Sequence, residues 1–436
     1  MRDWPRAAVL AGALLLAGAA PGGADTREVA SAEEPVATMG GVYRDPALAS
    51  YVGMVGMRLV AASGRPTRGW SFRVLDTPES NAFTLPGGRV LVTRGMLALA
   101  NDEAELATVL AHEIGHALAG DGQVPPGDRA RRAAEVAADR TGLRLLLRSG
   151  YDPGAQADFL KTLGAARALE ARLGGLAPGP SGAPDHPALG DRLRAAERGA
   201  GARAGAGVRN REAYLAAIDG ITWGDGPAQG IVRGRRFVHP DLGFAFDAPP
   251  GYELANLPDA VVASGPRGAM LLMDSIENPG GSPEDYLARG WAPEIARGIR
   301  AGPLEGVRRG KLNGLSMAQG ELAMTSDGSA RVAELTVVKL RDRFYRLTGL
   351  RMPGDAASGA ALAAAAGSFR PLSQGEAART RPLHLRMHRV ARGEDVAAMA
   401  AAMPVGPGAR ARFDVMNGLS GGGALRAGDL VKLVAD

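Results

Sequence analysis

The sequence predicts an α+β protein of several domains, and three observations lead to that prediction. Apolar residues recur at helical spacing in the first half of the chain, most clearly at Leu106, Val109, Leu110, Ile114 and Leu118. Short alternating segments follow between residues 237 and 372, which favours an antiparallel sheet with few helices. A run of alanine, glycine and arginine at 197–212 separates these regions and indicates a linker. At 436 residues the chain is also long for one domain.

The most periodic apolar stretch predicts a helix over residues 102–120. Asp102 is a candidate N-cap, and Glu105 three residues later completes a capping box. Gly120 is a helix stop signal. This helix therefore carries the motif HEIGH near its carboxyl end.

The HEIGH motif predicts a metal site. His112 and His116 are four residues apart, so their imidazoles lie on one face of the helix and can bind one tetrahedral cation. Glu113 lies beside that cation, where its carboxylate can take a proton from a water that the metal has made acidic. Histidine is scarce in this chain, with six in 436 residues, so a chance match is improbable. The motif indicates metal-dependent peptide hydrolysis.

A second helix is predicted between Pro126 and Gly150, with Asp128 as its candidate cap. Glu135 and Asp139 are four residues apart and share a face of it. An antiparallel return would bring Glu135 to the metal as third ligand, and Asp139 could accept the outer N–H of a ligand histidine. The alternative is an ordinary charged face, in which these acids pair with neighbouring arginines.

HEIGH followed by EVAAD resembles the HtpX/BepA-like family of bacterial zinc metallopeptidases, in its soluble periplasmic branch. The segments NAFTLPGGRVLVTRG and APDHPALGDRL agree with the same pattern, and the resemblance covers roughly residues 36–200. It implies a mainly helical zincin-type domain with a small sheet. It further implies Zn²⁺ bound by His112, His116 and Glu135, with Glu113 as catalytic base and Asp139 behind the ligands. The short connection between the two helices, 117–134, departs from many members and suggests a more open site.

The segment FTLPGGRVLVTRG alternates, is rich in β-branched residues and has a turn at Gly87 and Gly88. It predicts an edge strand past the zinc, to which an extended peptide could add by main-chain hydrogen bonds. Asn81 and Phe83 are the candidate substrate-binding residues. The alternative is a sheet edge with a purely structural role.

His186 stands before Pro187 and has two interpretations. On the sequence alone it is a solvated loop histidine. The resemblance implies instead a catalytic position near the metal, where the ring stabilises the oxyanion or caps the zinc.

The first 24 residues predict a secretory signal peptide. Arg2 and Arg6 precede the apolar run 7–20, which is short for a membrane span, and small residues allow cleavage after Ala24. The chain has no cysteine, which excludes disulfides and leaves any metal to histidine and carboxylate ligands. These features favour a periplasmic protein. Its arginines are dispersed, so nucleic acid is not an expected partner.

The rest of the chain predicts a linker at 201–230, an α+β accessory domain at 231–372 and a small domain at 383–436. The accessory domain has no catalytic constellation, so binding or positioning is its default role. The last domain resembles a divergent LysM module, which implies binding to peptidoglycan or a similar glycan. Its insertion PVGPGARA departs from that family, and a packing domain without ligand is the alternative.

Taken together, the sequence predicts a periplasmic zinc-dependent endopeptidase acting on unfolded or misassembled envelope proteins. Outer-membrane assembly machinery and peptidoglycan are further expected partner classes. The first alternative is an envelope chaperone, assembly factor or peptidoglycan-binding factor with little proteolysis. A second alternative, cleavage of peptidoglycan cross-links, is disfavoured because the motif resembles that of protein-cutting enzymes.

Overall fold

A computed structural model describes residue 36 and residues 40–120, 127–173, 189–257, 259–326, 328–406, 408–420 and 424–436. Two compact units divide this part of the chain. One consists of residues 32–226 together with 382–436, and we call it the peptidase unit after the domain that the sequence predicts in it. The other contains residues 227–381, and we call it the accessory unit. Within the described ranges, no helix is both long and apolar enough to cross a membrane. The predicted signal peptide lies outside these ranges.

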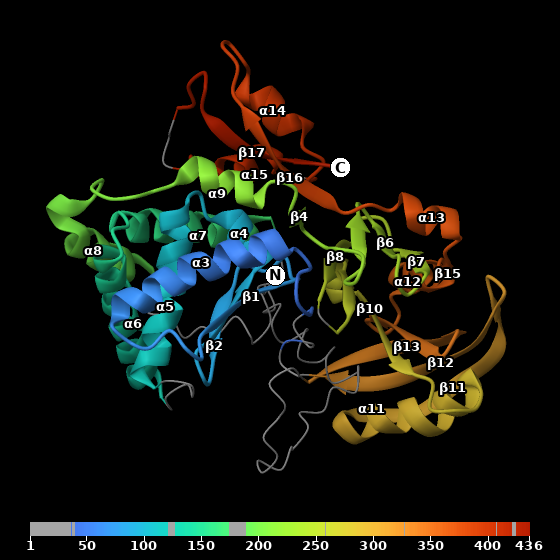
Figure 1. Ribbon diagram of the computed structural model, residues 1–436. Helices are drawn as coiled ribbons and strands as arrows, with labels where there is room; N and C mark the ends of the chain where they lie inside the picture. The colour runs from blue at the N-terminus through green and yellow to red at the C-terminus, as the bar shows by residue number, and fades with distance from the viewer. Residues whose placement is uncertain are drawn as a thin grey trace. The chain divides into compact units, whose positions relative to one another are not determined.

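The peptidase unit is built around helix α5, which carries HEIGH. Helix α5 contacts α3, α6, α7 and strand β2 (Figure 1). The helices of this part of the chain are α3 (Pro46–Ser63), α4 (Arg94–Leu99), α5 (Glu103–Ala119), α6 (Asp128–Arg148), α7 (Ala155–Arg172), α8 (Leu189–Ala200) and α9 (Arg211–Ile218), with a short 3₁₀ turn η1 (Gly201–Arg203). The predicted mainly helical domain with a small sheet is therefore present.

The limits of α5 follow from its sequence. The Asp102 carboxylate accepts the backbone N–H of Glu105 at 2.8 Å, and Gly120 ends the helix with a left-handed φ of 79°. Glu105 does not close the predicted capping box. Its carboxylate instead accepts the backbone N–H of Asn101 at 2.8 Å, one residue before the cap. The predicted helix is confirmed, with a different partner for Glu105.

A three-stranded sheet lies beside α5, in the order β1 (Ser71–Leu75), β3 (Arg89–Thr93), β2 (Ala82–Leu85). Strands β2 and β3 are antiparallel and are joined at Gly87 and Gly88, whose φ values of 87° and 75° only glycine adopts readily. Strand β2 is thus an edge strand, as the alternation predicts, and it faces helix α5.

The last fifty residues form two strands and two helices and belong to the peptidase unit. They form β16 (Leu383–Arg389), α14 (Val396–Ala402), α15 (Ala409–Met416) and β17 (Leu430–Ala435). Strand β16 pairs antiparallel with β17 on one side and with β4 (Thr222–Trp223) on the other. Leu385, Phe413 and Val431 are buried in the same apolar core as Leu97 and Leu110. The segment is therefore part of this core and not a separate domain.

The predicted linker 201–230 is largely structured, because ion pairs and hydrogen bonds join it to the rest of the peptidase unit. Arg209 pairs with Asp102 at 3.1 Å and with Asp152 and Asp158 at 2.8 Å each. Buried Arg94 donates to Asp76 at 2.6 Å and to the Thr222 carbonyl at 3.2 Å. Composition alone indicates a linker, because such long-range ion pairs leave no local signal.

The accessory unit is an antiparallel α+β domain, as the sequence predicts. Its larger sheet has the order β11-β12-β13-β14-β10-β9-β8, and its smaller sheet the order β15-β7-β6-β5. The strands are β5 (Ile231–Arg233), β6 (Arg236–His239), β7 (Phe244–Asp247), β8 (Glu253–Asn256), β9 (Val261–Ser264), β10 (Met270–Glu277), β11 (Arg300–Leu312), β12 (Leu315–Ser326), β13 (Ser329–Leu340), β14 (Arg343–Arg351) and β15 (Arg370–Pro371).

Helices and turns of the accessory unit cover parts of these sheets. They are η2 (Pro266–Gly268), α10 (Pro283–Asp285), the π-helical turn η3 (Tyr286–Trp291), α11 (Ala292–Gly298), α12 (Ala356–Gly367) and α13 (Gln374–Arg379). Aromatic residues Phe237, Phe244, Tyr345 and Phe369 fill the core between the sheets and α12.

Lys432 links the C-terminal strand to the end of α4, just before helix α5. Its side chain is fully buried, and Nζ donates to the carbonyls of Ala98, Leu99 and Ala100 at 2.9, 3.3 and 2.8 Å. Burial lowers the pKa of this ammonium, and the nearby Glu105 carboxylate opposes that effect. Three acceptors match the three donors of an ammonium, so we assign the charged form.

We expect Lys432→Met to destabilise the peptidase unit by about 3 kcal/mol, because it removes three charge-assisted hydrogen bonds and leaves buried carbonyls unpaired. For a unit of this size, that loss corresponds to a fall in Tm of roughly 6–12 °C. Thermal unfolding followed by circular dichroism would measure it. Lys311→Met, at an exposed position of β11, is the control. An equal Tm for the two variants would show that the hydrogen bonds of Lys432 do not stabilise the peptidase unit.

Candidate metal centre

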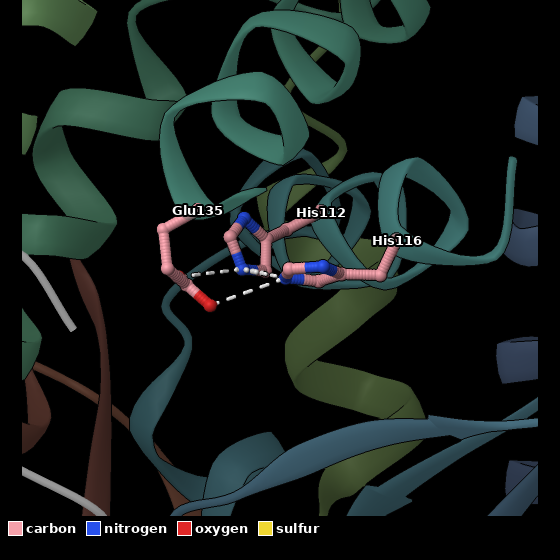
Figure 2. A group of neighbouring side chains, drawn as sticks. All are labelled: His112, His116 and Glu135. Carbon is pink, nitrogen blue, oxygen red and sulfur yellow. Dashed lines mark hydrogen bonds and ion pairs between the residues drawn. The ribbon is translucent and has the colours of Figure 1, made fainter. Parts of the chain in front are cut away.

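Two antiparallel helices bring the three predicted ligands together. His112 and His116 project from α5, and Glu135 projects from α6 toward them (Figure 2). The Nε2 atoms of the histidines are 3.1 Å apart. His112 Nε2 lies 3.3 Å from Glu135 Oε2, and His116 Nε2 lies 3.3 Å from Glu135 Oε1. The ligand atoms of all three residues lie within 4.8 Å of one another. This group could therefore hold one metal ion.

The separations are compatible with one cation held by all three residues. A cation with bonds of about 2.0–2.1 Å to nitrogen and oxygen spaces its ligand atoms at about 3.3–3.4 Å in a tetrahedral site. The two histidine nitrogens, 3.1 Å apart, are close to such an edge, and each faces a different oxygen of the Glu135 carboxylate at 3.3 Å. Three protein ligands among the described residues match the number that catalytic zinc sites supply.

Small residues allow the two helices to approach this closely. A Cβ added to Gly115 would lie 3.0 Å from the backbone of Ala138 on α6. A Cβ at Gly142 would lie 3.3 Å from the backbone nitrogen of His112. Both separations are tighter than ordinary side-chain contacts, so glycine at these positions keeps Glu135 within reach of the histidines.

Asp139 and Arg192 orient His112 from behind. Asp139 Oδ1 lies 3.0 Å from His112 Nδ1, which places the ring proton on Nδ1 and leaves the Nε2 lone pair for a metal. Arg192 on α8 donates to both Asp139 oxygens at 2.7 Å, and its Nη1 lies 3.7 Å from Glu135.

These contacts shift the pKa of both groups. Burial favours neutral Asp139, but hydrogen bonds from His112 and Arg192 outweigh it and lower the pKa of Asp139 to about 2. Burial likewise lowers the pKa of His112, but Asp139 and Glu135 overcome this effect and raise it to about 9. Asp139 is therefore an anion at neutral pH, and a metal must displace a proton from His112 to bind.

Glu113 is buried beside the ligands and is held by the edge strand. The Thr84 hydroxyl lies 2.9 Å from the Glu113 carbonyl and 3.2 Å from its carboxylate Oε2, as a donor to both. Glu113 is 8% exposed. Strand β2 thus positions the predicted base through Thr84.

The two candidate substrate-binding residues have different positions. Asn81 lines a cavity of about 90 Å³ together with His112 and Glu113. Phe83 packs instead against buried Leu75 and Leu91, away from the metal ligands. The cause is strand alternation, since Thr84 uses the face toward α5 and Phe83 lies on the opposite face. His186 lies outside the described residues.

Sequence reasoning missed Arg192, Thr84 and Gln156. The first stands six residues after His186, in the segment already quoted for the family resemblance, so its position could have been noted. Thr84 follows from period-two alternation once the inward face of β2 is known. Gln156 on α7 donates to the Asp139 carbonyl at 3.2 Å, and it gives no sequence signal because this contact depends on how α7 packs against α5.

Comparison with known proteins supports this assignment. Residues 46–125 match the family model "Peptidase family M48". The chain contains a peptidase M48 domain. The matched range includes HEIGH, while Glu135 follows it on the next helix.

Three relatives show the same relationship. The mitochondrial metalloendopeptidase OMA1 of Schizosaccharomyces pombe is 45% identical over 69 residues, which are 16% of this chain and 20% of that protein. The beta-barrel assembly-enhancing protease of Escherichia coli O157:H7 is 27% identical over 164 residues, covering 28% and 34%. A putative beta-barrel assembly-enhancing protease of Vibrio cholerae is 33% identical over 113 residues, covering 26% and 23%. The chain thus spans about a third or less of these relatives.

We expect Arg192→Gln to weaken zinc binding by about 10- to 100-fold, because Asp139 would lose the bidentate partner that fixes its orientation toward His112. Competition with a chromogenic chelator would measure the affinity. Arg194→Gln, an exposed arginine on the same helix that pairs with Asp191, is the matched control. Equal zinc affinities for the two variants would rule out an orienting role for Arg192.

Proposed function

We propose that this protein is a zinc-dependent endopeptidase that hydrolyses peptide bonds of unfolded or misassembled envelope proteins. The observation that carries the proposal is the convergence of the His112, His116 and Glu135 ligand atoms within 4.8 Å of one another, with Glu113 beside them. The two nitrogens and one oxygen suit zinc, and the M48 match supports peptide hydrolysis.

Each residue of the site has a separate role in the proposed hydrolysis. When bound, zinc would supply the Lewis acidity that makes water acidic and polarises the scissile carbonyl. Glu113 takes the proton of the attacking water and returns it to the leaving amine. Thr84 holds the Glu113 carboxylate, while Asp139 and Arg192 keep His112 in the tautomer that a ligand requires. The edge of β2 offers backbone groups to an extended peptide, which suits unfolded chains.

The location and partners belong to the same proposal. An apolar N-terminal run after two arginines supports export, and we place the protein in the periplasm. Two relatives named as beta-barrel assembly-enhancing proteases support envelope proteins as substrates and outer-membrane assembly machinery as a partner. Nucleic acid is not among the proposed partners.

Replacing Glu113 tests the proposed chemistry. Glu113→Gln should retain zinc, because it leaves the three ligands in place, and should lose about 10²- to 10⁴-fold in casein or peptide cleavage, because the amide cannot accept the proton. Metal analysis and cleavage assays would be run on the same samples, with Glu197→Gln, a half-exposed glutamate on α8, as control. Chelation should also abolish cleavage and added zinc should restore it. Equal cleavage by Glu113→Gln and wild type would refute the peptidase proposal.

Peptidoglycan is a second proposed partner, favoured by the strand-helix-helix-strand order of residues 383–436 with β16 and β17 paired. Because this segment shares the core of the peptidase unit, the isolated fragment is a poor reagent. The full-length protein should co-sediment with purified peptidoglycan, and N-acetylglucosamine oligomers should compete. A protein that stays in the supernatant would assign the segment a packing role only.

A further inference from the structure

A small cavity lies next to His112 and Glu113, and the proposed hydrolysis does not yet use it. It measures about 90 Å³, and His112 and Glu113 form part of its lining. Met96, Val109, Phe159 and Leu163 supply buried apolar wall from α4, α5 and α7. A peptide lying along β2 would pass this cavity with the bond to be cut near Glu113.

The size of the cavity limits its occupant. An engineered apolar cavity of about 150 Å³ accommodates benzene, and cofactor pockets measure about 300–1,000 Å³. A space of about 90 Å³ is therefore too small for an aromatic ring or a free cofactor. It suits one unbranched side chain of a bound peptide.

Gln156 supplies an unused acceptor at this cavity. Its Nε2 donates to the Asp139 carbonyl at 3.2 Å, which fixes the orientation of the amide because a carbonyl can only accept. Its Oε1 is buried and has no hydrogen-bond partner among the described residues. Gln156 is 4% exposed and lines the cavity. A buried acceptor without a partner is costly, so an occupant that donates to it gains affinity.

The charges around the cavity favour a neutral occupant. Two cations, Arg167 and Arg192, and two anions, Glu113 and Asp139, line it, so these four side chains carry no net formal charge. An ionised occupant would lose its hydration there without a net counter-charge, which is costly. A neutral primary amide on an aliphatic stem supplies a donor of suitable length without that cost.

We propose that this cavity binds a glutamine side chain of the substrate, adjacent to the scissile bond, with the glutamine amide N–H donating to Gln156 Oε1. The stem of the glutamine packs against Met96, Val109 and Leu163. The proposal rests on the proposed peptidase function, since it names a substrate feature for the same site. It makes Gln156 a specificity-determining residue of this chain.

The test compares matched fluorogenic peptides that differ at one position, which carries Gln, Leu, Glu, Lys or Phe. The position is placed in turn on each side of the scissile bond. At one of the two positions, the zinc-loaded full-length protein should cleave the Gln peptide with a kcat/KM about fivefold higher than that of the Leu peptide. The kcat/KM values of the Glu, Lys and Phe peptides should be lower still. Equal values for Gln and Leu on both sides would overturn the proposal.

Two variants and a binding assay make the result specific. In Gln156→Met, the ratio of kcat/KM for the Gln peptide to that for the Leu peptide should fall to about one. In Leu163→Phe, the new side chain fills the cavity, so a peptide with Ala at this position should be cleaved faster than the Gln and Leu peptides. An unchanged Gln-to-Leu ratio in Gln156→Met would refute the assignment even if overall turnover falls. Fluorescence anisotropy with the zinc-loaded Glu113→Gln protein measures the same preference without turnover. If wild type cleaves no peptide but this preference persists, the proposed function fails and the glutamine pocket stands.

Discussion

The burial of helix α5 on every side is the constraint on which the rest of the structure depends. Nearly all residues from Glu103 to Gly115 are buried, including the acidic residues of the first turn. Buried carboxylates are stable only with partners, and here the partners come from distant parts of the chain. They are Tyr51 and Tyr151 on Glu103, Arg209 on Asp102, and Lys432 near Glu105. The helix that carries the metal ligands is therefore held by residues spread from α3 to β17.

This dependence explains why the chain returns to the peptidase unit after the accessory unit. Strand β17 delivers Lys432 to the carbonyls at the end of α4, directly before the Asp102 cap of α5. Arg211 reinforces the same junction, donating to the carbonyls of Asn101 and Leu430. Whatever the C-terminal segment binds, it completes the support of the catalytic helix. A glycan-binding role and a packing role are thus compatible.

Spacing along single elements could be predicted from the sequence, and relations between elements could not. His112, Glu113 and His116 follow from helical periodicity, and Glu135 and Asp139 follow from a second helix of known phase. The rotation of β2 decides that Thr84 and not Phe83 faces α5, and the packing of α7 and α8 decides the roles of Gln156 and Arg192. The limits of the domains could not be predicted for the same reason, since the ion pairs of Arg209 and the pairing of β16 with β4 join positions far apart in sequence.

The charge balance of the metal centre links its supporting residues to its chemistry. Three carboxylates, Glu113, Glu135 and Asp139, lie around the ligand histidines, and Arg192 contacts two of them, Asp139 and Glu135. Their formal charges sum to minus two, which a divalent ion offsets. Arg192 pairs with Asp139 and Glu135, and among the described residues the side-chain donor to the Glu113 carboxylate is the neutral Thr84 hydroxyl. Beside a divalent ion, Glu113 is thus the carboxylate placed for the proposed proton transfer, whereas Asp139, held by Arg192, stays an anion and orients His112.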